Sequence, residues 1–232
     1  LPDKLKKRKF GKWKLELTGV VFPDEVTHRA SGDGWMFTLG GQKALSKKDD
    51  QCWFIRPLRG GEIDMGIRVP ARSSLKDKCI AIFGIGAVGA PLVLELAKNG
   101  ARELHLFDHD TVEPGQSVRW PLGLEAYGSS KLDSLEKFIR ANYPDVDVFP
   151  YPNRVGELRF KHTDGRVLPE TSQVELLRDV IENVDLVVDT TAEVAVTHVL
   201  SDFCRENKTL FVCAYGYPGA WGGVVAHFSP GS

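Results

Sequence analysis

The chain has 232 residues, with 30 Lys and Arg against 31 Asp and Glu, and a formal net charge of −1 at pH 7. Hydrophobic residues make up 42% and charged residues 26%, which are ordinary values for a globular protein and exclude a disordered, collagen-like or coiled-coil chain. The near-zero charge argues against a nucleic-acid or membrane-surface binder, because such affinity is mostly electrostatic. The longest apolar stretch, residues 81–97, is interrupted by glycine, proline and glutamate, so no membrane span is expected.

Residues 1–70 differ from the remainder and are predicted to form a small β-rich N-terminal segment, interpreted as a candidate end of an upstream domain. The basic cluster in residues 1–14 is interpreted as a solvated segment. Short strands are predicted at 15–22 and 35–39, because the turn-rich stretch 30–34 separates them.

From Leu75 onward, strands alternate with helices. Residues 79–83 form a continuous apolar run, as expected of a strand buried on both faces, and a helix at 88–99 follows. The same pattern predicts strands at 103–107, 146–151, 186–189, 210–214 and 223–228, helices at 129–143, 172–183 and 193–207, and a hairpin within 155–170. The alternation predicts an α/β fold for residues 71–232: a Rossmann-like, doubly wound, mostly parallel sheet with helices on both faces.

A glycine-rich loop, Gly84-Ile85-Gly86-Ala87-Val88-Gly89, lies between the first buried strand and its helix. This is the GxGxxG pattern in the context that dinucleotide and nucleotide sites require. Glycines let the backbone approach a phosphate closely, and the helix start offers unpaired N–H groups and the positive end of its dipole. Asp108 ends the next strand, where an acidic residue can bind ribose hydroxyls. These features predict an adenine-nucleotide site and leave NAD open.

Two cations follow the second strand. Arg119 comes after Asp108-His109-Asp110, and Lys131 stands in the first turn of the next helix. A diphosphate dinucleotide needs no such pair, whereas a triphosphate attacked at its α-phosphate builds up charge that fixed cations stabilise. Arg119 and Lys131 are therefore the candidate catalytic residues, with ordinary surface placement as the alternative for either cation alone.

Taken together, Gly84–Gly89, Asp108-x-Asp110, Arg119, Gly128-x-x-Lys131 and Asp189-Thr190-Thr191 resemble the ThiF-type adenylyltransferases. This family includes the activating enzymes of ubiquitin-like proteins and of sulfur-carrier proteins. The resemblance covers about residues 70–230, and it is closest to bacterial members found in ubiquitin-like conjugation operons. In some of those, the adenylation domain follows a domain similar to ubiquitin-conjugating enzymes.

The resemblance implies ATP-dependent adenylation of the C-terminal carboxylate of a ubiquitin-like or sulfur-carrier protein with a Gly-ended tail. The products are an acyl-adenylate and pyrophosphate, and the cofactors are ATP and Mg²⁺. It also implies a cytoplasmic enzyme of a kind that commonly forms homodimers. By position, Arg119 and Lys131 hold phosphates, and the nucleotide-binding residues are Gly84, Gly86, Ala87, Gly89, Asp108, Asp110, Gln116 and Asp189. No general base is required, because a carboxylate is already ionised at neutral pH.

The chain departs from the family pattern at several positions. Ala192 stands where the family has its metal-binding aspartate, so Asp189 is the predicted magnesium ligand, with Glu193 or ATP itself as alternatives. Gln116 and Trp120 replace the usual Asn and Gln around the arginine. In the family a cysteine-bearing loop, often with CxxC zinc pairs, follows a strand like 223–228, so the domain is expected to be truncated at its C-terminus.

Two other functions stay open on the sequence. The YxxxK spacing of Tyr127 and Lys131 is that of an NAD(P)-dependent oxidoreductase, but the pair falls at a helix start just after the second strand and is interpreted as coincidence. Ala192 keeps open a catalytically inactive ThiF-like subunit that only binds a protein. The cysteines lack any CxxC pair, which suits a reducing cytosol, and Cys52, Cys204 and Cys213 are interpreted as core thiols.

Overall fold

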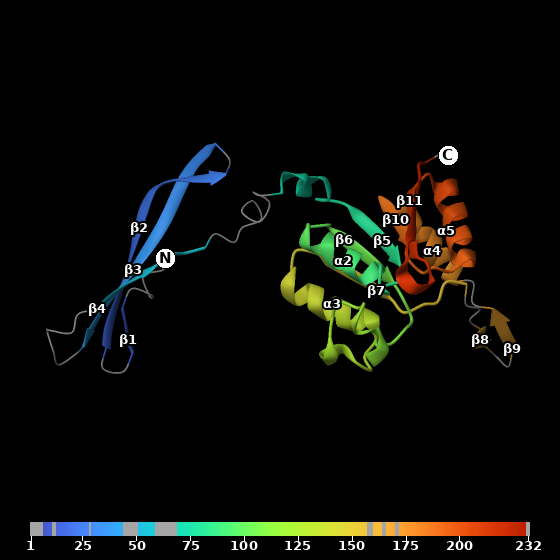
Figure 1. The fold of residues 1–232 in the computed structure, drawn as a ribbon, viewed down its shortest axis with the longest axis horizontal. Helices are drawn as coiled ribbons and strands as arrows, with labels where there is room; N and C mark the ends of the chain where they lie inside the picture. Colours follow the sequence, from blue (N-terminus) through green and yellow to red (C-terminus); the bar gives the residue numbers. More distant parts are fainter. Residues whose placement is uncertain are drawn as a thin grey trace. The chain divides into compact units, whose positions relative to one another are not determined.

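The structure is a computed structural model that describes residues 7–10, 13–27, 29–43, 51–58, 69–156, 160–163, 166–169 and 172–230. The chain divides into two compact units, Leu1–Pro70 and Ala71–Ser232 (Figure 1). Among the described helices, none is long and apolar enough to cross a membrane.

The first unit is a four-stranded antiparallel sheet in the order β1-β2-β3-β4. Its strands are β1 (Lys7–Phe10), β2 (Trp13–Thr27), β3 (Ala30–Lys43) and β4 (Gln51–Ile55). The central pair β2–β3 runs through the stretch that was predicted to be a turn, and β1 and β4 were not predicted at all. Cross-strand pairing explains the difference, since β propensity depends on the partner strand more than on local sequence.

The second unit contains a six-stranded sheet in the order β12-β11-β10-β5-β6-β7, in which β12 alone runs antiparallel to its neighbour. The strands are β5 (Cys79–Phe83), β6 (Glu103–Phe107), β7 (Asp147–Tyr151), β10 (Leu186–Asp189), β11 (Leu210–Gly216) and β12 (Gly223–Phe228). The Rossmann-like, mostly parallel sheet predicted from the sequence is confirmed. After β5 the chain adds strands first on one side and later on the other, and a doubly wound sheet opens a crevice where its order reverses.

Helices cover both faces of this sheet, as Figure 1 shows: α2 (Gly89–Lys98), α3 (Lys131–Asn142), α4 (Ser172–Glu182) and α5 (Val194–Asn207). Alternate residues of β5 enter two separate cores. Ile80 and Ile82 pack with residues of α2 and α3, whereas Ala81 and Phe83 pack with residues of α4 and α5. Burial on both sides explains why this strand is a continuous apolar run. The predicted hairpin is present as β8 (Phe160–Thr163) and β9 (Arg166–Pro169).

The cysteines divide between core and surface. Cys79, Cys204 and Cys213 are buried, and burial raises the pKa of Cys204 to about 12, so this thiol is not a nucleophile at neutral pH. The interpretation of Cys204 and Cys213 as core thiols is confirmed. The same interpretation of Cys52 is wrong: Cys52 lies on β4 and is exposed, because the first unit has a sheet but no second layer in its described part.

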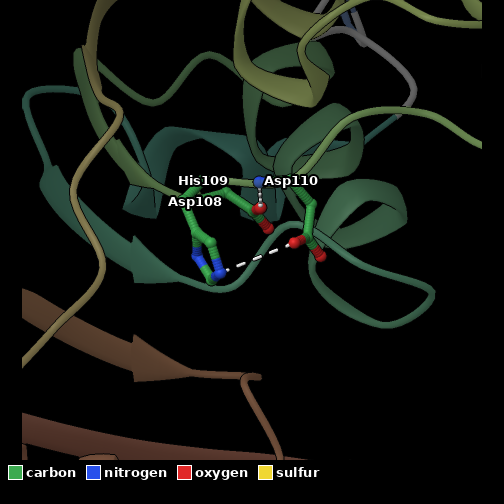
Figure 2. A group of neighbouring side chains, drawn as sticks. All are labelled: Asp108, His109 and Asp110. Atoms are coloured by element: carbon green, nitrogen blue, oxygen red, sulfur yellow. Dashed lines mark hydrogen bonds and ion pairs between the residues drawn. The ribbon is translucent and has the colours of Figure 1, made fainter. Parts of the chain in front are cut away.

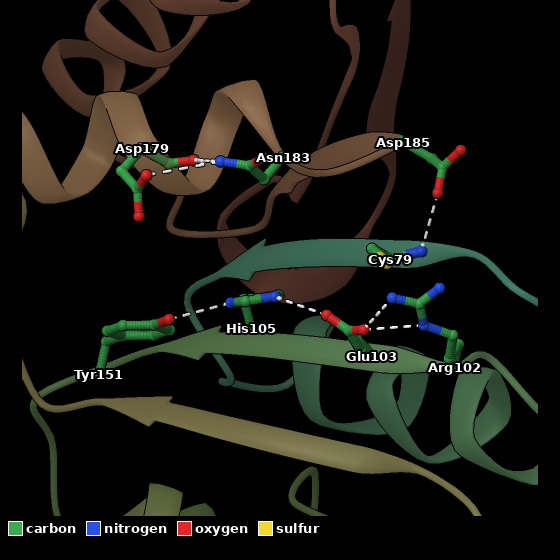
Figure 3. A network of polar contacts seen from close by, with 8 residues as sticks. All are labelled: Cys79, Arg102, Glu103, His105, Tyr151, Asp179, Asn183 and Asp185. Carbon is green, nitrogen blue, oxygen red and sulfur yellow. Dashed lines mark hydrogen bonds and ion pairs between the residues drawn. The ribbon is translucent and has the colours of Figure 1, made fainter.

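A line of polar side chains crosses β6 and β7 on the face that carries α4 and α5 (Figure 3). His105 contacts the hydroxyl of Tyr151 at 3.0 Å through Nδ1 and approaches Glu103 at 3.7 Å through Nε2. Its ring also stacks on Phe149, with ring centroids 4.8 Å apart. Burial lowers the pKa of His105, although the neighbouring Glu103 raises it to a smaller extent. The imidazole is therefore neutral in the folded protein at neutral pH.

This histidine should make the stability of the fold depend on pH. In the unfolded chain a histidine gains its proton near a pH of about 6.5, whereas the folded state resists that proton to lower pH. The free energy of unfolding should therefore fall as the pH drops below about 6.5, and the loss should be complete below the depressed folded pKa. Urea unfolding measured at several pH values in this range gives the free energy of unfolding as a function of pH. Its slope against pH should be shallower for His105→Gln than for the exposed control His198→Gln. Equal slopes would contradict the assignment.

Candidate functional site

A cleft that is open to solvent lies at the carboxyl ends of β5, β6 and β10. Its lining includes Gly84, Gly86, Asp108, His109, Asp110, Lys131, Asn153, Arg154, Thr190, Thr191 and Glu193. These residues come from five separate stretches of the chain, which the parallel strands bring to one edge of the sheet. Phosphate- and nucleotide-binding crevices of doubly wound folds lie at this position.

Each of the three loop positions requires glycine for a different structural reason. Gly84 has φ of +81°, and a Cβ there would lie 2.9 Å from the backbone of Thr191. At Gly89 a Cβ would lie 2.0 Å from the carbonyl oxygen of Gly84 and 2.5 Å from the hydroxyl of Thr190. A Cβ at Gly86 would meet nothing within 4 Å. Gly84 and Gly89 therefore shape the loop against the end of β10, whereas Gly86 keeps the backbone accessible from the cleft.

Asp108 fixes the loop from the end of β6. Its Oδ2 accepts a hydrogen bond from the Ile85 backbone N–H at 2.8 Å, and its Oδ1 accepts one from the Asp110 N–H at 2.8 Å (Figure 2). The side chain is nearly buried but still lines the cleft. Each carboxylate oxygen has a further lone pair, so this arrangement is compatible with the predicted contact to a ribose.

Lys131 and Asp110 form an ion pair on the same wall. The Lys131 Nζ lies 2.8 Å from Asp110 Oδ2, and the lysine side chain is only 6% exposed. Backbone hydrogen bonds place them, from Lys131 N–H to the Asp110 carbonyl at 3.0 Å and from Val112 N–H to the Ser129 carbonyl at 2.9 Å. Lys131 is the main reason that the pKa of Asp110 lies below its usual range. The cleft therefore presents a fixed, nearly buried cation.

The segment before α3 contains Trp120, one of the departures from the family pattern, and its contacts show what this side chain does. Trp120 is buried, and its indole N–H donates to the carbonyl of Ile85 at 2.9 Å, so it anchors this segment to the glycine loop. Arg119, next to it, is exposed and is not part of the cleft lining, and neither are Gln116 and Ala87. In the described part of the chain, Oε1 of Gln116 is buried and accepts no hydrogen bond.

We expect Trp120→Phe to lower the free energy of unfolding by about 1–3 kcal/mol, since it leaves the buried Ile85 carbonyl without its donor. Denaturant unfolding measures the change. The matched control Trp221→Phe alters a side chain that is 93% exposed and should change stability by less than about 0.5 kcal/mol. Similar effects of the two substitutions would show that the indole hydrogen bond does not anchor the loop.

Two carboxylates near the end of β10, Asp189 and Glu193, have different surroundings. Asp189 is 2% exposed, and its Oδ1 accepts hydrogen bonds from the Thr191 N–H at 2.9 Å and the Thr191 hydroxyl at 2.7 Å. Its Oδ2 accepts from the hydroxyl of Thr197 on α5. Asp189 is not in the cleft lining, but Glu193 is. Ala192 between them has φ of +60°. This geometry gives Asp189 a bracing role and favours Glu193 as the carboxylate that a metal ion in the cleft can reach.

The sequence analysis missed Asn153, Arg154 and Val155, which follow β7 and line the cleft. No motif marks them. One signal was available: in a doubly wound sheet, residues just after a strand's carboxyl end face the crevice.

Comparison with known proteins decides the family. The ThiF family model matches residues 64–231 of this chain. The chain belongs to the ThiF family. The family assignment made from the motifs is thereby confirmed.

The relatives of this ThiF-family chain include a protein named "Uncharacterized protein y4qC" from Sinorhizobium fredii, 36% identical over 226 residues, or 94% of this chain and 38% of the relative. The SAMP-activating enzyme E1 of Haloferax volcanii is 28% identical over 127 residues, covering 54% of this chain and 41% of that enzyme. A crystal structure of E. coli MccB with ATP has a TM-score of 0.55 at 16% identity, covering 71% of this chain and 45% of MccB, which supports the fold. The chain spans well under half the length of these curated relatives.

Proposed function

We propose that this ThiF-family domain binds Mg-ATP in its cleft and adenylates the C-terminal carboxylate of a ubiquitin-like or sulfur-carrier protein whose tail ends in glycine. The observation that carries the proposal is the pairing of an accessible glycine loop at Gly86 with the nearly buried cation Lys131 on one cleft wall. A loop open to a phosphate and a fixed cation beside it are the elements that phosphoryl and adenylyl transfer require. The likeness to the SAMP-activating enzyme E1 supports the same reaction class.

The chemistry needs positioning more than acid–base catalysis. The carrier's carboxylate is ionised at neutral pH. One of its oxygens attacks the α-phosphorus of ATP, a new O–P bond forms, and the bond to the bridging oxygen breaks to release pyrophosphate. Lys131 stabilises the negative charge that grows on the phosphoryl oxygens, and Asp108 orients the ribose through its free lone pairs.

Magnesium fits the residues present, although Ala192 cannot ligate it. Glu193 on the cleft wall and Asp110 beside Lys131 offer carboxylate oxygens, which Mg²⁺ prefers as protein ligands. Ligand atoms of Asp108, His109 and Asp110 also lie within 4.8 Å of one another. A bound Mg²⁺ would neutralise charge on the triphosphate, and Glu193 is the residue that we assign to hold it.

The structure argues against one of the two alternatives. The Tyr–Lys pair of an oxidoreductase is not supported, because Tyr127 packs against the core of α2 and α3 and is not among the cleft-lining residues, while Lys131 is paired with Asp110. A catalytically inactive ThiF-like subunit is favoured by one observation, the absence of a carboxylate at Ala192.

ATP–pyrophosphate exchange with a purified Gly-ended carrier protein tests the proposal. We expect exchange that depends on ATP, on Mg²⁺ and on the carrier's terminal carboxylate. Carrier binding without exchange would favour the inactive subunit, and NAD binding without ATP binding would favour the oxidoreductase. Light scattering on the same sample tests the homodimer that the family commonly forms.

A further inference from the structure

The cleft lining carries an ion pair that joins two distant parts of the chain. Arg154 follows β7, and Glu193 precedes α5. The Arg154 guanidinium nitrogen lies 3.7 Å from Glu193 Oε1, and the two side chains are 57% and 51% exposed. Both residues line the cleft.

The other charges of the lining are already held. Lys131 is paired with Asp110 at 2.8 Å and is nearly buried. Each carboxylate oxygen of Asp108 accepts a hydrogen bond from a backbone N–H group. Within the described lining the cations are Lys131 and Arg154, since Arg119 is not part of it. Arg154 is therefore the lining cation that is free to move toward an anion.

The contact between Arg154 and Glu193 is weak enough for phosphate oxygens to replace the carboxylate. Its 3.7 Å separation exceeds the length of a good charge-assisted hydrogen bond, and exposed ion pairs contribute little to stability. A guanidinium binds phosphate oxygens in a bidentate geometry that a single distant carboxylate oxygen does not satisfy. The pKa of Asp110 is lowered mainly by Lys131, and Arg154 adds a smaller effect of the same sign.

We propose that Arg154 binds the β- and γ-phosphates of the nucleotide, and that its pair with Glu193 is a latch: when the nucleotide binds, Arg154 exchanges the Glu193 carboxylate for phosphate oxygens. This inference rests on the proposed function, because it assumes that ATP enters the cleft. Release of Arg154 leaves Glu193 free to approach the Mg²⁺ that accompanies the triphosphate.

Direct binding measurements on the whole chain test the latch without using catalysis. Calorimetric titration with ATP and with AMP, in Mg²⁺ and in EDTA, compares the wild type with Arg154→Ala, Glu193→Gln and Arg205→Ala. The last is a matched control, because Arg205 is an exposed arginine that pairs with Asp202 on α5. Thermal unfolding confirms that each variant folds.

We expect Arg154→Ala to weaken ATP binding by about ten- to a hundredfold, the equivalent of one lost charge-assisted contact, and AMP binding by less than about twofold. Glu193→Gln should strengthen ATP binding in EDTA, because it unlatches Arg154, and should reduce the gain in affinity that Mg²⁺ gives. Arg205→Ala should bind both nucleotides as the wild type does.

The outcomes separate the latch from the function on which it rests. If Arg154→Ala binds ATP normally while Lys131→Ala does not, the latch is wrong and the nucleotide site stands. Equal losses of ATP and AMP affinity in Arg154→Ala would also overturn it, since they would place the guanidinium on the nucleoside or the α-phosphate, which AMP shares with ATP, and not on the β- and γ-phosphates. A wild type that binds no ATP removes both the latch and the proposed function.

Discussion

Lys131→Ala should abolish ATP–pyrophosphate exchange, with a rate loss of at least about a hundredfold, because it deletes a cation held in place before the reaction begins. The ion pair with Asp110 and the backbone hydrogen bonds at Lys131 and Ser129 hold this side chain in place at 6% exposure. The fold should persist, because Asp110 is half exposed and tolerates the loss of its partner. The measurement is exchange of labelled pyrophosphate into ATP at saturating carrier.

The matched control is Lys137→Ala, which removes the same charge from an exposed position on the same helix. It should leave exchange unchanged. Normal exchange in Lys131→Ala would mean that the cleft does not act on a triphosphate through this residue. The same assay on Arg119→Ala tests the second predicted phosphate contact, which the sequence analysis also expects to be essential. Normal exchange there would transfer that role to Arg154, which lines the cleft.

Gly89→Ala should destabilise the domain by about 3 kcal/mol or more, because the added methyl group would sit 2.0 Å from the Gly84 carbonyl oxygen. The Gly84 carbonyl belongs to the backbone and cannot move aside as a flexible side chain can. The added Cβ would also lie 2.5 Å from the hydroxyl oxygen of Thr190. The loop must therefore separate from β10 or the helix start must shift. Denaturant unfolding followed by circular dichroism measures the loss.

Gly86→Ala is the matched partner, with the same chemical change three residues earlier. Nothing lies within 4 Å of the new methyl group, and Gly86 is not among the glycines with positive φ, so stability should change by less than about 1 kcal/mol. ATP affinity should nevertheless fall by about tenfold, since the methyl group stands where a phosphate approaches the backbone. Equal stabilities of the two variants would contradict the packing assigned to Gly89, and unchanged ATP affinity in Gly86→Ala would contradict the phosphate contact.

Sequence reasoning worked best where structure is local. The apolar run 79–83, the glycine loop and the helix after it are confirmed within a residue or two, because each depends on neighbours along the chain. It failed in the first unit, where β1 and β4 exist only through pairing with β2 and β3. Cys52 was misplaced for the same reason, since its exposure depends on whether a second layer covers the sheet.

Within the site, the sequence by itself determined the glycine loop, Asp108 and the presence of Lys131, because the motif ties these residues to consecutive strand ends. Only the tertiary structure decided which charges meet. It pairs Lys131 with Asp110 and Arg154 with Glu193, buries Asp189 among threonine hydroxyls, and leaves Arg119 outside the cleft lining. The physical reason is distance along the chain: each contact joins segments that approach only when the sheet assembles, and no local pattern encodes that approach.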